Sequence, residues 1–221
     1  MDYELFIGRC KIELHNGDCM EAMRKMPDNA YELAITDPPY GINAAKMNMG
    51  KGSCIDTGKV AKKSWDSSAP EPDYFDELQR VSKNQIIWGA NHFIDSIPFA
   101  CNSSCWCIWD KKDYNSDFAD GEMAWTSFRS VMKIFQRARA TGGDQKNKIH
   151  PTQKPVALYK WLLQNYAKKG DKILDTHLGS GSIALACWDM GFELTGYELD
   201  EDYFNSACER LENHTAQGQL F

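Results

Sequence analysis

The sequence has no apolar run long enough to cross a membrane, no Cys-x-x-Cys pair, and no basic and apolar leader, since it starts MDYELF. These absences argue against a membrane-spanning helix and a signal peptide, so we expect a cytoplasmic protein. The eight cysteines are scattered, which predicts free thiols in a reducing compartment. Cys101, Cys105 and Cys107 fit no common zinc spacing, and we expect no metal site.

Positive charge is scarce outside two short segments. The formal net charge is −6, which by itself argues against a nucleic-acid partner. Residues 46–63 and 129–148 nevertheless hold eleven of the 25 basic residues and only two of the 31 acidic ones. Such clusters are typical of phosphate-contacting loops, although loops that merely face solvent have the same composition. We predict DNA contacts from Lys59, Lys62, Lys63, Arg129, Arg137 and Arg139.

The 221 residues, 43% of them hydrophobic, suffice for one core. We expect a single domain, 1–221, with basic loops at about 41–70 and 129–149. Strand-like runs alternate with helical patterns, which predicts an α/β, doubly wound sheet. We expect strands at 11–15, 31–36, 84–89, 105–110, 123–128, 131–136, 172–175 and 193–198, and helices at 19–26, 73–82, 155–167, 182–190 and 200–213. The runs at 123–128 and 131–136 predict an antiparallel edge hairpin.

The stretch TDPPYG, residues 36–41, follows the apolar run YELAI. Proline lacks an amide hydrogen and keeps the preceding residue out of the helical region. Asp37, Pro38 and Pro39 should therefore form a stiff corner at the end of a strand. With a carboxylate on one side and the Tyr40 ring on the other, the corner suits a flat polar ligand, although a plain proline-stiffened turn has the same signature.

A second stretch, KILDTHLGSGSIALACWDMG at 172–191, combines a short strand, a glycine-rich turn and an apolar helix. Gly179 and Gly181 would let a ligand approach the backbone, and the helix start offers free amides. Glu198 lies 19 residues past Gly179, where an acid is placed to accept ribose hydroxyls. Because only one more strand and helix follow this loop, the sheet is predicted to be circularly permuted.

Further motifs occur in one order along the chain: NGDC at 16–19, QIIWGANHF at 85–93, IWDK at 108–111, HPTQKP at 150–155, DTHLGSGS and GYELD. With TDPPYG they resemble the beta-class amino-group DNA methyltransferases over nearly the whole chain. The resemblance implies a Rossmann-like fold, S-adenosylmethionine as cofactor, DNA as substrate, and a bacterial or phage restriction-modification context. It also implies methyl transfer to the exocyclic amine of a flipped base.

The resemblance also assigns roles to single residues. Asp37 and the Pro38 carbonyl would accept hydrogen bonds from the amine, with Tyr40 stacking on the base. Asp18 is assigned to the cofactor adenine and Glu198 to its ribose. The other residues assigned to cofactor binding are Lys154, Pro155, Asp175, His177, Gly179, Ser180 and Gly181. Thr176 and His177 replace the family's usual Pro-Phe, and we expect His177 to be hydrogen-bonded and structural rather than catalytic.

Several functional alternatives stay open. The DPPY motif favours adenine over cytosine as the target within the family, with the cytosine exocyclic amine as the alternative. Another hypothesis is a noncatalytic nucleic-acid-binding subunit of a methyltransferase pair, although such subunits typically lose the acid or the glycines that this chain retains. A methylase of RNA is a third. Neither the recognition sequence nor a restriction partner follows from the sequence.

Two protein partners are also predicted. Beta-class relatives often pair, so we expect a homodimer. The end of the chain, QGQLF, resembles the short peptide that docks bacterial replication and repair proteins on the sliding clamp, with Gln217, Leu220 and Phe221 as anchors. Alternatively, Leu220 and Phe221 fold back onto the domain. The preceding helix is expected to end near Asn213.

Overall fold

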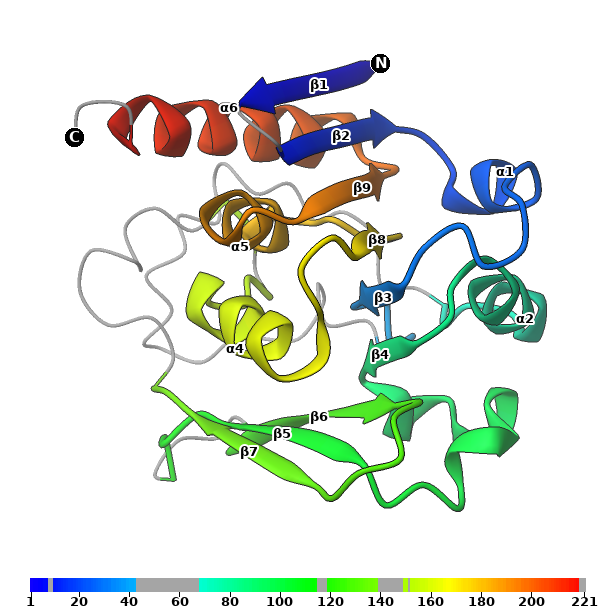
Figure 1. The fold of residues 1–221 in the computed structure, drawn as a ribbon. Helices are drawn as coiled ribbons and strands as arrows, with labels where there is room; N and C mark the ends of the chain where they lie inside the picture. Colours follow the sequence, from blue (N-terminus) through cyan, green and yellow to red (C-terminus); the bar gives the residue numbers. More distant parts are fainter. Residues whose placement is uncertain (8–9, 43–67, 115–118, 139–148, 151, 219–221) are drawn as a thin grey trace.

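The computed structural model of the chain describes residues 1–7, 10–42, 68–114, 119–138, 149–150 and 152–218. Within these ranges the strands form a nine-stranded sheet of order β1-β2-β9-β8-β3-β4-β6-β5-β7 (Figure 1). The strands are β1 (Asp2–Ile7), β2 (Cys10–Asn16), β3 (Leu33–Thr36), β4 (Gln85–Trp88), β5 (Trp106–Asp110), β6 (Gly121–Thr126), β7 (Lys133–Gln136), β8 (Lys172–Asp175) and β9 (Glu193–Glu198).

The permuted order is confirmed. Strand β3, which leads into TDPPYG, comes long before β8 in the chain, yet the two strands pair in parallel. Strands β2, β9, β8, β3 and β4 are all mutually parallel. Every residue of β3 and β4 is buried, as expected for continuous apolar strands that are covered on both faces.

Helices cover both faces of this parallel core. They are α1 (Cys19–Met23), α2 (Pro72–Val81), α4 (Val156–Tyr166), α5 (Ser182–Met190) and α6 (Glu201–Gly218), with short 3-10 turns η2 (Ala90–His92), η3 (Ile94–Ser96) and η4 (Pro98–Ala100). Figure 1 shows α4 and α5 on one side of the central strands and α1 and α2 on the other. Each face has its own buried apolar cluster. Among the described helices, none combines the length and apolar character needed to cross a membrane.

The antiparallel part of the sheet pairs differently from the expected hairpin. Strand β6 is antiparallel to both β4 and β5, and β7 is parallel to β5. The predicted pairing of 123–128 with 131–136 is therefore wrong. Both edges of β6 are already occupied by β4 and β5, so β7 can only extend the sheet beyond β5. A third antiparallel pair, β1 with β2, closes the other edge and was not expected.

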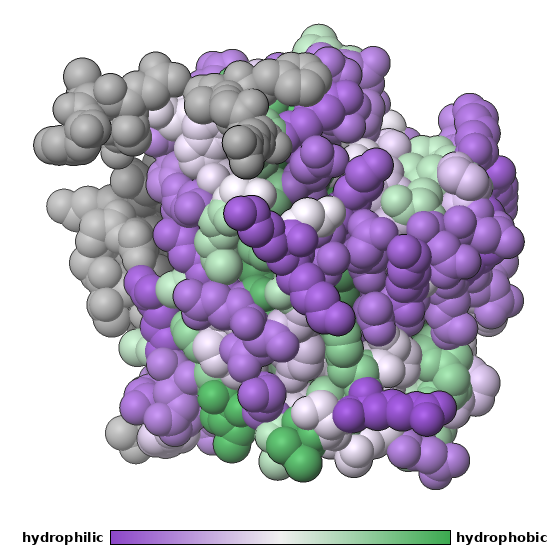
Figure 2. Space-filling view, in the orientation of Figure 1, coloured by the Kyte–Doolittle hydropathy of each residue, from purple (hydrophilic) through white to green (hydrophobic). Residues whose placement is uncertain are grey.

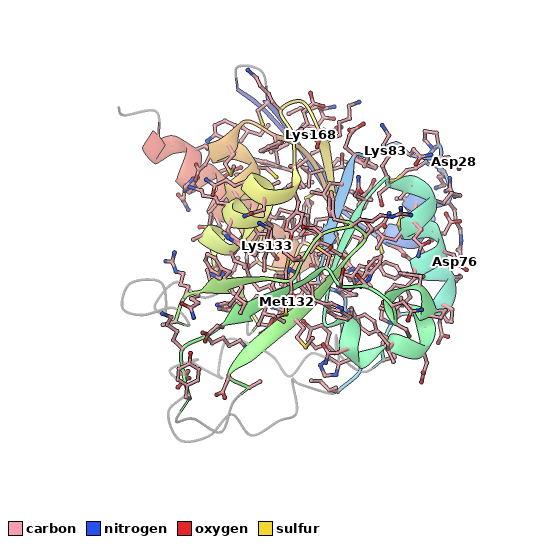
Figure 3. The ribbon with its side chains drawn as sticks, turned by 60° about the horizontal axis from the view of Figure 1, so that its bottom comes forward. Asp28, Asp76, Lys83, Met132, Lys133 and Lys168 are labelled. Atoms are coloured by element: carbon pink, nitrogen blue, oxygen red, sulfur yellow. The ribbon has the colours of Figure 1, made fainter. Side chains whose placement is uncertain are left out.

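The β7 edge exposes apolar side chains. Val131, Met132 and Ile134 are 72%, 54% and 55% exposed, and Figure 2 shows apolar groups in the lower part of the molecule, where β5, β6 and β7 lie in Figure 1. Figure 3 labels Met132 and Lys133 at the start of this strand. A lysine on an edge strand opposes edge-to-edge pairing with another sheet.

Helix α6 is longer than the sequence predicts, because it continues to Gly218 instead of ending near Asn213. The extra turns are anchored to the domain. His214 contacts the Asp189 carboxylate on α5 at 2.6 Å, and Thr215 is buried. Gln217 lies within this helix, whereas Leu220 and Phe221 lie outside the described residues.

Candidate active site

The predicted motifs meet at one edge of the sheet, where the parallel strands end. Asp37 follows β3 and Gly89 follows β4, while Asp175 and Glu198 are the last residues of β8 and β9. Asp18 follows β2 after one intervening residue. In open α/β sheets, ligands bind outside the carboxyl ends of the strands, so the strand order alone assembles the candidate site.

The corner formed by Asp37, Pro38 and Pro39, here called the acid-proline corner, is held by two hydrogen bonds to the Asp37 carboxylate. Tyr40 donates its hydroxyl to Oδ1 of Asp37 at 2.7 Å, and the Lys154 ammonium donates to Oδ2 at 2.5 Å. The Asp37 side chain is 18% exposed, and Pro38 behind it is buried. The carboxylate is thus fixed at the surface of the corner, as expected for a group that accepts hydrogen bonds from a substrate.

The Tyr40 ring, predicted to stack on a base, already stacks on an exposed imidazole. Its centroid lies 4.8 Å from that of His92, with 14° between the ring planes. Gly89 makes room for the ring: it has φ +67, and a Cβ there would lie 2.0 Å from Tyr40 Cε1. The glycine in QIIWGANHF therefore makes room for the Tyr40 ring of the acid-proline corner, a link that sequence reasoning missed.

The turn at Gly179, Ser180 and Gly181, here called the glycine loop, follows β8 and is hydrogen-bonded to Glu198 at the end of the neighbouring strand β9. The amide of Gly179 donates to Glu198 Oε2 at 2.8 Å, and the amide of Asp200 donates to Oε1 at 2.9 Å. Gly179 and Gly181 have φ +52 and +68, values that residues with a side chain rarely adopt. Burial raises the pKa of Glu198.

The NGDC motif, residues 16–19, also contacts Glu198. Gly17 and the Asn16 side chain donate to the Glu198 carbonyl at 3.0 and 2.9 Å. Asp18 caps α1 by accepting the Met20 amide at 2.8 Å, and it is exposed. The two residues assigned to the cofactor's adenine and ribose, Asp18 and Glu198, are therefore neighbours in space.

The residues that replace the family's Pro-Phe form a polar cluster. Thr176 is buried, and its hydroxyl lies 3.0 Å from Nδ1 of His177. Burial lowers the pKa of His177 to about 4, so the imidazole is neutral at physiological pH. Asp175 is buried as well and accepts the His177 amide at 3.0 Å. This arrangement fits the hydrogen-bonded role that we predict for His177.

The HPTQKP segment bridges the glycine loop and the acid-proline corner. At its start, His150 packs edge-on against Tyr203, with 4.4 Å between ring centroids, and lies beside Gly179. At its end, Lys154 reaches Asp37, and Pro155 caps α4. Lys154 was assigned to the cofactor, but its ammonium contacts the carboxylate assigned to the amine.

Sequence reasoning missed three charged residues at this edge. Arg210 holds the glycine loop by donating to the Ser180 carbonyl at 2.8 Å. Glu122 pairs with both Lys154 and Lys111. Glu122 lies near the start of β6, and because β6 is antiparallel to β4, its first residues reach the carboxyl ends of the parallel strands. The only signal for Lys111 was its place at the end of IWDK.

The predicted DNA-binding residues fall into two groups. Arg129 and Arg137 are exposed on either side of β7. Since β7 is parallel to β5, which is antiparallel to β6, Arg137 follows the end of β7 that lies at the site edge. Lys59, Lys62, Lys63 and Arg139 lie outside the described residues, as does most of the two basic loops.

Comparisons with known proteins agree with this geometry. A family model described as DNA methylase, of the N6/N4 type, matches residues 102–209. The type II methyltransferase M2.MboI of Moraxella bovis is 26% identical, over 92% of this chain and 89% of its own length. The solved M1.HpyAVI–SAM complex has a TM-score of 0.62 at 19% identity and covers 90% of this chain and 98% of its own. The cytosine-N4-specific PvuII DNA methyltransferase has a TM-score of 0.59 at 12% identity, with 93% and 92% covered.

The solved structures share a Rossmann-like fold with this chain. The family match and the sequence relative agree with the resemblance to the amino-group DNA methyltransferases of the N6/N4 type.

Proposed function

We propose that this protein transfers a methyl group from S-adenosylmethionine to the exocyclic amine of adenine in DNA. One observation carries the proposal: the acid-proline corner and the glycine loop adjoin at the same sheet edge. The Thr36 hydroxyl, directly before Asp37, lies 2.7 Å from that of Thr176, directly after Asp175. A donor held by the loop and an acceptor held by the corner would therefore be neighbours.

The part of the site around the glycine loop fits a cationic nucleoside. Burial raises the pKa of Asp175 to about 8, so this carboxyl would be ionised by a ligand that brings positive charge close to it. Glu198 Oε2 accepts the Gly179 amide and Oε1 accepts the Asp200 amide, and because a carboxylate oxygen has two lone pairs, ribose hydroxyls could also donate to this carboxylate. We assign Asp18 to the adenine of the cofactor. When bound, S-adenosylmethionine would supply a methyl group already activated on sulfur, with no metal required.

The part of the site around the acid-proline corner fits an aromatic amine. The lone pair of such an amine is delocalised into the ring, which makes it a poor nucleophile. Asp37 and the Pro38 carbonyl would accept hydrogen bonds from its two N–H groups and direct the lone pair toward the methyl group. The target base lies inside a duplex stack, so it must be flipped out. The Tyr40 and His92 rings would then support the flipped base.

Adenine is proposed because of DPPY, and cytosine at its exocyclic amine is the alternative. The likeness to the cytosine-N4-specific PvuII enzyme is a reason to keep the alternative. A type II methyltransferase among the relatives supports a restriction-modification role. The homodimer and the sliding clamp stay predictions, which light scattering and clamp binding by a variant lacking residues 217–221 would check.

The test is methyl transfer from tritiated S-adenosylmethionine to duplex DNA and, in parallel, to RNA, followed by nucleoside mass spectrometry. N6-methyladenine is expected, N4-methylcytosine would select the alternative, and labelled RNA would indicate an RNA methylase. Asp37→Ala should abolish transfer and leave cofactor affinity within about threefold, because the carboxylate is assigned to the amine. Asp76→Ala, at an exposed position of α2 (Figure 3), is the control. An active Asp37→Ala enzyme would exclude this mechanism.

A further inference from the structure

Four charged side chains form a continuous chain behind the acid-proline corner. The Lys154 ammonium lies 2.5 Å from Asp37 Oδ2 and 2.9 Å from Glu122 Oε2. The other Glu122 oxygen lies 2.6 Å from the Lys111 ammonium. Two cations and two anions alternate, so the chain is electrically neutral as a whole.

These four charged side chains lie beside two tryptophan rings. The Lys154 side chain is only 2% exposed, and its ammonium lies 5.2 Å from the centroid of the buried Trp88 ring. The Lys111 ammonium lies 5.2 Å from Trp109. Removing an ion from water costs several kcal/mol, and attraction between partners repays this only when the geometry is good. Such an arrangement is a poor way to gain stability, because apolar side chains of similar volume often serve as well.

The four residues come from separate segments. Asp37 follows β3, Glu122 lies on β6, Lys111 follows β5 and Lys154 precedes α4. Among the four, Asp37 is the residue assigned to the amine. The others would act on the reaction through the charge and position of that carboxylate.

We propose that Lys154 is a positioning residue that keeps Asp37 ionised and aimed at the amine, and that Glu122 balances its charge. The inference rests on the methyl-transfer function proposed above. Asp37 accepts a hydrogen bond from the amine best as a carboxylate, and burial opposes its ionisation by raising its pKa. Lys154 counteracts that effect, whereas the negative charge of Glu122 adds to it.

Glu122 has a second consequence for the site. Two ammonium groups lower its pKa to about 2, although burial disfavours its charge. It is therefore ionised at all working pH values. Without it, the site would carry an unbalanced cation beside the place proposed for a positively charged cofactor.

The two residues should shift the acid limb of the pH profile of kcat/KM in opposite directions. Lys154→Met removes the cation, so we expect the limb to move up by about 1 to 3 pH units, the range for an opposite charge at contact distance. Glu122→Gln removes the anion, so the limb should move down. Lys154→Arg keeps the charge and should keep the limb in place. Lys160→Met is the matched control, because Lys160 pairs with Asp189 at the surface.

A lower kcat with an unmoved acid limb in both Lys154→Met and Glu122→Gln would overturn the proposal, since a merely structural role predicts that result. If Lys154→Met does not fold, the acid limbs of Glu122→Gln and Lys154→Arg decide. The proposal requires the limb to move down in Glu122→Gln and to stay in place in Lys154→Arg. If the parent enzyme shows no methyl transfer, the proposed function has failed on its own. NMR titration of the Asp37 carboxyl in carbon-13-labelled protein then tests the charge chain without activity.

Discussion

The hydroxyl groups of Thr36 and Thr176 lie 2.7 Å apart, although 140 residues separate them in the chain. The Tyr74 hydroxyl joins them, at 3.1 Å from Thr36 and 2.7 Å from Thr176. All three residues are buried. This hydroxyl cluster joins the last residue of β3 to the residue that follows β8, and a proline in place of Thr176 could not form it.

A double-mutant cycle measures that junction. Thr36→Val and Thr176→Val should each lower the free energy of unfolding by about 1 to 3 kcal/mol, because each leaves buried hydroxyls short of a partner. The double variant should cost less than the sum, since the shared bond is lost only once. Urea unfolding measures all four proteins, and strict additivity would show that the 2.7 Å contact carries no coupling.

Gly89→Ala should disable the acid-proline corner. The new Cβ would lie 2.0 Å from Tyr40 Cε1, so the ring must move and release Asp37. We expect loss of methyl transfer with cofactor affinity retained. Gly191→Ala is the matched control, because Gly191 has a similar φ, +73, and nothing within 4 Å of the added atom. Equal activity losses in the two variants would assign the effect to backbone strain alone.

Glu198→Ala should weaken cofactor binding by about 1 to 3 kcal/mol, the range for a lost charge-assisted hydrogen bond. It should also lower the melting temperature, because the carboxylate accepts the Gly179 and Asp200 amides. Calorimetry and thermal unfolding measure the two effects. Glu209→Ala, on the exposed face of α6, should change neither. A destabilised variant with parental affinity would leave Glu198 as a loop support only.

Cofactor affinity should rise with pH because of Asp175. Burial raises its pKa to about 8, helped by the charges of Asp37 and Glu198 and opposed by the His177 amide and Lys154. A cation bound nearby would lower that pKa, so binding should release a proton below about pH 8 and tighten as pH rises toward it. Calorimetry in two buffers of different ionisation enthalpy detects the proton. Asp175→Asn should bind with less proton release, and an unchanged release would exclude Asp175 as its source.

Charge reversal beside β7 should weaken DNA binding. Arg137→Glu, just past the end of β7 at the site edge, should raise the dissociation constant and lower the slope of its logarithm against log salt concentration by about 1, the effect of one lost phosphate contact. Lys168→Glu, in the turn before β8 at the opposite edge of the sheet, is the control. A slope identical to the parent's would show that Arg137 only faces solvent.

The sequence by itself determined the α/β class, the permuted order and the residues of both motifs. The reason is local: a buried apolar run that ends in Asp-Pro-Pro, or in an acid followed by glycines, specifies a strand and its turn within about ten residues. Once the strands are parallel, their carboxyl ends must share one edge. Asp18, Asp37, Asp175 and Glu198 therefore meet there without any knowledge of their contacts.

Only the tertiary structure decided which side chains become partners. The HPTQKP motif identified Lys154 as a site residue. Its pairing with Asp37, however, depends on where the segment before α4 crosses the sheet edge. Glu122 gave no signal, because its place depends on β6 running antiparallel to β4, and the paired strands lie more than thirty residues apart in the chain. Local patterns specify strands and turns, whereas the order in which strands pair is a property of the whole sheet, and that order brings Glu122 and Lys154 to Asp37.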